Sequence, residues 1–157
     1  KNRIVKTYDD DVRIFLVECL RRVDYLKNCD EEILVHLAYN FKPETREKGA
    51  FLYRCDEEED LQIRNEMIIV FEGVIEIVTD MDAGTEFAIE LLTTGSVLNP
   101  HNFLVDRKHI VNYRFQLNTT FFYIKYGNFI EVAQKYPRFA RILVEQRGAA
   151  EADKSRD

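Results

Sequence analysis

Residues 67–77, MIIVFEGVIEI, constrain the fold of this chain more than any other stretch. Two runs rich in β-branched and aromatic residues flank Gly73, a pattern typical of two strands joined by a tight turn. Glycine adopts the positive φ that such a turn needs, whereas isoleucine or valine would be strained there. The stretch therefore predicts a β-hairpin that turns at Glu72 and Gly73.

Helical periodicity is found on both sides of the strand-like segments. Apolar residues three and four positions apart predict helices over residues 9–25 and 30–40, the second with Asp30 as its N-cap. Residues 1–8 lack this pattern and are expected to be a frayed lead-in. Further strands are expected at 41–46, 50–54, 85–92, 110–115 and 119–124, and helices at 129–135 and 138–147. Within 85–92, Phe87, Ile89 and Leu91 alternate and are expected on one face.

Strands clustered between helices indicate the α+β class. The number of strands and the glycine spacing predict an antiparallel eight-stranded β-roll, jelly-roll-like, flanked by N-terminal helices and two C-terminal helices. The expected organisation is a linker-type helical region at 1–29, a folded domain at 30–147 and a flexible tail at 148–157.

The composition excludes several function classes. The net charge is −6, which disfavours nucleic-acid binding because phosphate contacts need clustered Lys and Arg. Cys19, Cys29 and Cys55 form no CxxC pair and are expected to be free thiols in a reducing compartment. No apolar run reaches the roughly 20 residues of a membrane span. The chain begins with Lys1 and is expected to be a piece of a longer protein.

The sequence predicts no catalytic residue and no metal site, so we expect a non-enzyme. It contains no nucleophile–base motif, GxGxxG or P-loop. The acidic run at 56–60 is expected to be a solvated loop, because adjacent carboxylates in a strand point to alternating faces. His36 lies among apolar helical neighbours and is interpreted as a packed residue.

Several segments together resemble the cyclic nucleotide-binding domain family over residues 30–147. They are EKGAFLYR, MIIVFEGVIEIV, EFAIELLTTGSV and EVAQKYPRFARIL, with Gly49, Gly73 and Gly95 in the family's order. Tyr136-Pro137 fits the lid that follows the roll. Within the family, the chain looks most similar to the C-terminal cytoplasmic region of cyclic-nucleotide-gated and hyperpolarisation-activated cation channels.

The resemblance implies a regulatory domain on the cytoplasmic side of a tetrameric cation channel, potassium or non-selective. Its partners would be the pore and linker of the same polypeptide, with residues 9–25 as the relay and residues 138–147 as the moving helix. The alternative is a soluble sensing module similar to a kinase regulatory subunit or an exchange factor. A kinase inhibitor would need a basic pseudosubstrate, and Arg21-Arg22 followed by Val23-Asp24 does not match one. The bacterial transcription-factor branch fits less well, because the chain is acidic and ends soon after its last helix.

The family's phosphate-binding cassette has a Gly-Glu pair for the ribose and an Arg for the phosphate. From Gly95 onward, this sequence places Asn99-Pro100 at the Gly-Glu pair, His109 at the Arg, and Ile110-Val111 at the small residues that follow. Pro100 has neither a carboxylate nor an amide donor. His109 is mostly neutral at pH 7, so the phosphate loses a fixed positive charge.

We therefore expect no cofactor and a pocket that has lost ordinary cAMP or cGMP binding. In that case the domain would set a fixed bias on gating and serve in assembly. The alternative is a rebuilt cyclic-nucleotide or anion site that uses Arg107, Lys108 or His109. The candidate ligand-binding positions follow the family cassette: Gly95, Asn99, Pro100, His101, Asn102, Arg107, Lys108, His109, Ile110 and Val111.

Overall fold

The computed structural model describes residues 2–56, 65–80, 86–105 and 111–156. The described helices are α1 (Asn2–Leu20), α2 (Glu31–Tyr39), α3 (Tyr126–Ala133), α4 (Pro137–Arg156) and the short 3-10 helix η3 (Asn102–Leu104). The described strands are β1 (Lys42–Arg46), β2 (Phe51–Tyr53), β3 (Glu66–Glu72), β4 (Ile75–Asp80), β5 (Glu86–Leu92), β6 (Val97–Leu98), β7 (Asn112–Phe115) and β8 (Thr119–Lys125).

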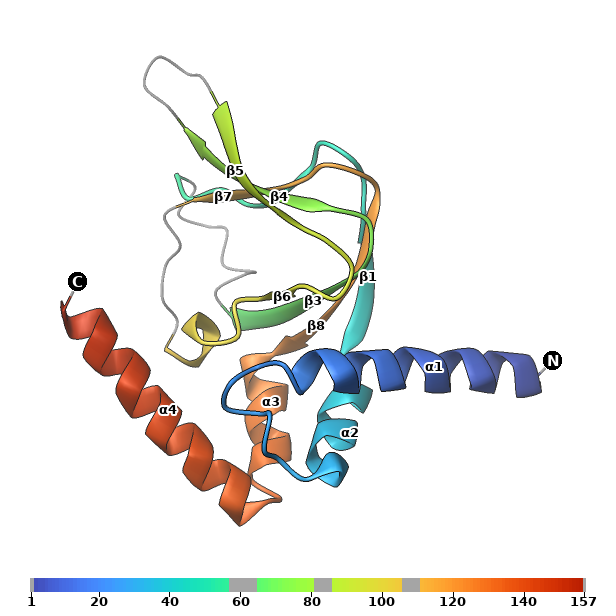
Figure 1. Cartoon of the computed structure of the whole chain (residues 1–157), viewed down its shortest axis with the longest axis vertical. Coiled ribbons are helices and arrows are strands. Elements are labelled where there is room, and N and C mark those ends of the chain that lie inside the picture. Colours follow the sequence, from blue (N-terminus) through green and yellow to red (C-terminus); the bar gives the residue numbers. More distant parts are fainter. Residues whose placement is uncertain (1, 57–64, 81–85, 106–110, 157) are drawn as a thin grey trace.

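The eight described strands form two antiparallel four-stranded sheets. One sheet has the order β1-β8-β3-β6 and the other β2-β7-β4-β5. Figure 1 shows α1, α2 and α3 gathered below the first sheet, while α4 leads away along one side. This confirms the α+β class and the antiparallel β-roll of eight strands.

The predicted hairpin at Gly73 is wrong, although both of its strands exist. β3 pairs with β6 and β8, whereas β4 pairs with β5 and β7, so the two strands belong to different sheets. Gly73 has φ +111°, as expected for a bend. A Cβ there would lie 2.4 Å from Thr119 Oγ1, because the β7–β8 turn packs directly against this bend. Strand propensity indicated the bend, but it did not indicate which strands would pair.

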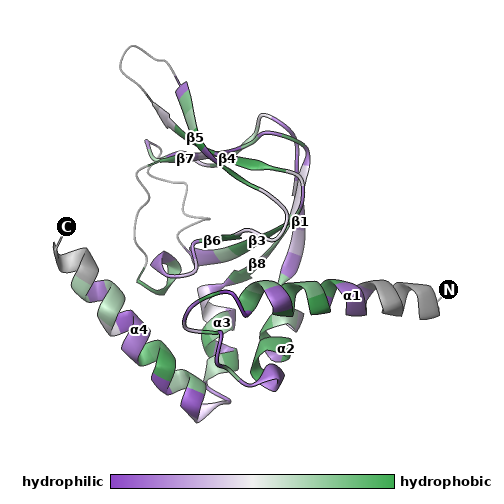
Figure 2. Ribbon diagram, viewed as in Figure 1, coloured by the Kyte–Doolittle hydropathy of each residue, from purple (hydrophilic) through white to green (hydrophobic). Residues whose placement is uncertain are grey.

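Two apolar clusters stabilise the fold. Met67 and Ile69 point from β3 toward the helices, and Ile68 and Val70 point into the space between the sheets. All four side chains are fully buried, as the period of two in a strand requires when both faces are covered. In Figure 2, hydrophobic colouring covers much of β3 and parts of α2 and α3. The first sheet is thus the middle layer of the molecule.

The N-terminal helix is displaced from its predicted range of 9–25. α1 begins at Asn2, which overturns the frayed lead-in, and it ends at Leu20. The chain then continues in tight turns, with the Val23 amide bonded to the Leu20 carbonyl. Arg22 and Tyr25 bond to a distant loop instead of continuing the helix. Asp30 precedes α2 as predicted, but its side chain makes no capping hydrogen bond.

The C-terminal helices also differ from the prediction. α3 begins at Tyr126 and includes Gly127 and Asn128, which were expected to lie before it. α4 continues through Gly148 to Arg156, so the segment predicted as a flexible tail is mostly helical. Ala149, Ala150 and Ala152 are strong helix formers and offset the roughly 1 kcal/mol cost of one internal glycine.

The apolar alternation in β5 does not produce one apolar face. Leu91 pairs with Glu76 and Phe87 with Thr79, and Ile89 is an extra residue at a register shift. Glu76 and Thr79 are three positions apart on β4, so their partners lie on opposite faces. Phe87, Ile89 and Leu91 all remain at least half exposed.

Candidate functional site

The predicted cassette begins at a tight turn after β5. Gly95 is buried and has φ +90°, which an L-residue adopts only with strain. Its amide donates to the Val70 carbonyl at 2.8 Å, and the Val70 amide donates to the Ser96 carbonyl at 3.0 Å. These bonds attach the turn to β3 and set the register of β6.

Asn99 stabilises the next bend of the loop through its backbone conformation and its buried side chain. It has φ 68°, a value that asparagine tolerates better than most residues, and its side chain is buried. Its Nδ2 donates to the carbonyl of Glu66 at 2.9 Å. The Asn99 side chain, which the sequence resemblance aligns with the family's glycine, therefore has a structural partner on β3.

The turns between α1 and α2 bond to both ends of this loop. Arg22 Nη2 donates to the Gly95 carbonyl at 2.7 Å, and the Tyr25 hydroxyl donates to the Pro100 carbonyl. The Tyr25 ring also meets the His101 ring edge to face, with centroids 5.5 Å apart. Burial raises the pKa of the Tyr25 phenol, which keeps it protonated and able to donate. The loop is therefore fixed to the N-terminal helical segment.

The short helix η3 connects the loop to the C-terminal helices. His101 is exposed and Asn102 is half-buried, whereas Phe103 and Leu104 are buried. The Phe103 ring contacts Tyr126 and Phe129 of α3 at centroid distances of 5.9 and 5.1 Å. A displacement of η3 would therefore disturb the base of α3.

The basic half of the predicted cassette is not placed. Arg107, Lys108, His109 and Ile110 lie outside the described residues. Val111 is half-buried and packs against the cluster between the sheets. The rebuilt anion site at these residues stays a prediction.

Aromatic side chains fill much of the described space between the sheets. The Phe115 and Phe121 rings stack with centroids 5.7 Å apart, and the Tyr53 and Tyr113 ring centroids are 6.4 Å apart. Burial raises the pKa of Tyr113 to about 12. These rings belong to the packed core cluster between the sheets.

The other residues considered in the sequence analysis are His36 and the three cysteines. His36 Nδ1 lies 3.0 Å from the Tyr136 hydroxyl, which joins α2 to the turn between α3 and α4. Cys19, Cys29 and Cys55 are free thiols. The described residues contain no cluster of three metal-ligating side chains, and none of their helices is long and apolar enough to cross a membrane.

Comparisons with known proteins identify the fold. No protein-family model matches the sequence, and no curated protein matches it. Among solved structures, the N-terminal domain of a transcriptional regulator from Streptomyces coelicolor A3(2) superposes with a TM-score of 0.68 at 16% identity, covering 88% of this chain and 93% of that one. A cyclic nucleotide-binding-like protein from Brucella abortus superposes with a TM-score of 0.65 at 17% identity. The match covers 76% of this chain and 97% of that one.

Regulatory subunits of kinases also share the fold. That of a cAMP-independent protein kinase A from Trypanosoma cruzi, bound to guanosine, gives a TM-score of 0.60 at 16% identity and covers 88% of this chain. The match spans 45% of that subunit. The chain thus has the cyclic nucleotide-binding fold, and the resemblance to channels in particular is not shown by these neighbours.

Sequence reasoning missed the two residues that hold the loop. Arg22 and Tyr25 fall within a range predicted as helix, where nothing in their spacing distinguishes them from surface and core positions. Only the early end of α1 at Leu20 turns them toward Gly95 and Pro100.

Proposed function

We propose that this chain is a regulatory domain, not an enzyme, in which the state of the cassette is transmitted to α1. The observation that carries the proposal is the pair of hydrogen bonds from Arg22 to Gly95 and from Tyr25 to Pro100. Each connects the turns after α1 to one end of the β6 loop. A change in the loop therefore alters the direction in which α1 leaves the domain.

The proposed setting is the cytoplasmic side of a tetrameric cation channel, with α1 leading toward the pore. The support is the sequence resemblance together with a helix of 19 residues directly before the bonded turns. A helix of that length extends about 28 Å, enough to transmit a change in direction to a second domain. In this setting the partner is the pore and linker of the same polypeptide.

The alternative is a soluble module of the kinase-regulatory kind that binds a nucleoside without its phosphate. The guanosine-bound kinase subunit with the same fold favours this candidate. Pro100 is compatible with such a ligand, since its side chain offers no charge to a phosphate.

Calorimetric titration with cAMP, cGMP and guanosine separates these cases. Saturable binding of cAMP or cGMP, lost in Arg107→Ala, indicates a rebuilt phosphate site. Binding of guanosine alone indicates the nucleoside module. The absence of binding heat with all three ligands indicates a domain that sets a fixed bias on channel gating or serves in assembly. In that case Tyr25→Phe should still shift gating when the domain is joined to a channel. Unchanged gating would contradict the coupling.

A further inference from the structure

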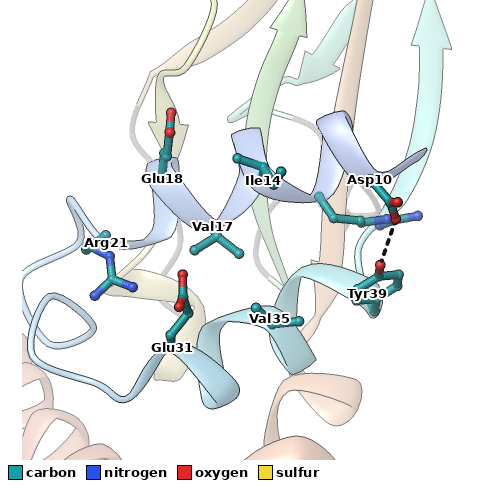
Figure 3. Close-up of a pocket in the computed structure, with 9 residues that line it drawn as sticks. Asp10, Ile14, Val17, Glu18, Arg21, Glu31, Val35 and Tyr39 are labelled. Carbon is teal, nitrogen blue, oxygen red and sulfur yellow. Dashed lines mark hydrogen bonds between the residues drawn. The ribbon is translucent and has the colours of Figure 1, made fainter. Parts of the chain in front are cut away.

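A groove between α1 and α2 lies apart from the cassette and has an exposed apolar floor. Its volume is about 530 Å³, and its lining comes from these two helices and from Arg21, directly after α1. Figure 3 shows Ile14, Val17 and Val35 along the floor, with charged side chains at both ends.

The floor is exposed to an unusual degree. Ile14 is 58% exposed, Tyr39 51% and Val35 37%, while Val17 between them is buried. Of the eight large apolar side chains exposed among the described residues, three gather in this groove. Contiguous exposed apolar surface bordered by polar residues is typical of an interaction site.

The charges at the border favour a basic partner. Arg13 is turned inward, where its Nη1 donates to the carbonyls of Ala38 and Phe41 at 2.7 and 3.0 Å and its Nε pairs with Asp9. Its positive charge is thus balanced within the domain.

The remaining charged lining residues are Asp10, Glu18, Glu31 and Arg21, an excess of carboxylates. Glu18 and Glu31 make no hydrogen bond or ion pair within the described part of the chain, and both border the end of the groove where Arg21 lies (Figure 3). They are free to meet an incoming cation.

We propose that this groove binds an amphipathic helix of a partner protein, whose apolar stripe is flanked by Lys or Arg. A third helix laid along α1 and α2 would cover Ile14, Val35 and Tyr39 and place its cations near Glu18 and Glu31. A second copy of the chain fits less well. If α1 packed on itself about Ile14, Asp10 would face Glu18 of the copy, and like charges would meet.

Two designed peptides of about 18 residues, or five helical turns, test the proposal on the whole chain. Both carry leucine at three- and four-residue spacing, one with lysine on the flanks and the other with glutamate. Fluorescence anisotropy should show the basic peptide binding at least about tenfold more tightly than its acidic twin, a difference of about 1.4 kcal/mol. The double variant Glu18→Lys, Glu31→Lys should reverse that preference.

Ile14→Ser and, separately, Val35→Ser should each weaken the basic peptide several-fold. Ile14→Ser should leave the unfolding midpoint nearly unchanged, because more than half of that side chain is exposed. Phe87→Ser removes an equally exposed apolar side chain elsewhere and should leave binding unchanged. Equal affinity for both peptides, or binding insensitive to Ile14→Ser and Val35→Ser, would overturn the proposal. So would a concentration-dependent dimer in sedimentation that Ile14→Ser dissociates, because the occupant would then be a second copy.

Discussion

The hydroxyl of Tyr25 donates a hydrogen bond to the carbonyl oxygen of Pro100, joining residues 75 positions apart. The sequence resemblance aligns Pro100 with the family's glutamate, and in this structure the Pro100 backbone carbonyl accepts a hydrogen bond from the N-terminal segment. The Tyr25 side chain is almost fully buried, so packing holds its hydroxyl in position for this bond.

Removing this donor should destabilise the domain. Tyr25→Phe leaves the Pro100 carbonyl without its partner, and we expect the free energy of unfolding to fall by about 1–3 kcal/mol. Urea unfolding followed by circular dichroism measures it, with Tyr39→Phe as the control, because the Tyr39 hydroxyl is exposed and bonds weakly to Asp10 at 3.4 Å. Equal midpoints for the wild type and Tyr25→Phe would show that the bond contributes nothing.

The same phenol should make stability depend on pH in the alkaline range. Burial raises the pKa of Tyr25 above its ordinary value of 10.0, so the folded state retains a proton that the unfolded state releases. The stabilisation is complete below the unfolded pKa, near pH 10, and decreases as the pH rises toward the folded pKa. Between pH 10 and 11, the free energy of unfolding should fall less steeply in Tyr25→Phe than in the wild type, by up to about 1.4 kcal/mol per pH unit. Parallel slopes for the two proteins would contradict this assignment.

Gly73 and Gly49 offer a matched pair for the bend between the sheets. Both have positive φ, but a Cβ at Gly73 meets Thr119 Oγ1 and the Asn118 carbonyl at 2.4 and 2.7 Å, whereas a Cβ at Gly49 meets nothing within 4 Å. Gly49→Ala should lower the free energy of unfolding only by the cost of holding an L-residue at positive φ, about 1–2 kcal/mol. Gly73→Ala should cost a further 1–3 kcal/mol or so for overpacking. Thermal unfolding of the two variants checks the order, and equal losses would show that the turn moves aside freely.

Arg13 should stabilise the end of α2. Arg13→Met keeps most of the side-chain stem but loses the hydrogen bonds to the Ala38 and Phe41 carbonyls, and we expect a loss of about 2 kcal/mol. Arg147→Met removes an exposed ion pair with Glu151 and an exposed hydrogen bond to the Tyr126 hydroxyl, and it should cost clearly less, about 0.5–1 kcal/mol. Chemical denaturation of both variants provides the comparison. A loss at Arg13 no larger than that at Arg147 would contradict a capping role.

Local sequence patterns predicted where the strands lie better than they predicted which strands pair with one another. The apolar runs on either side of Gly73 correctly indicated β3 and β4, since strand propensity depends on neighbouring residues. Their assignment to different sheets depends on β8, which lies about fifty residues later and pairs with β3. The loop contacts of Arg22 and Tyr25 are likewise decided by packing across the chain, so no local pattern marks them. Gly95 was predictable because its positive φ is a local requirement.

The central place of β8 has a consequence for how the protein is made. β1 and β3 both take β8 as their neighbour, and β2 and β4 both take β7. During synthesis from the N-terminus, four strands therefore emerge before the two strands that join them. The nascent chain must keep the apolar strands among them from aggregating until β7 and β8 have left the ribosome. Stalled or truncated products that end before Asn112 would lack both joining strands, and they are natural targets for chaperones and proteases.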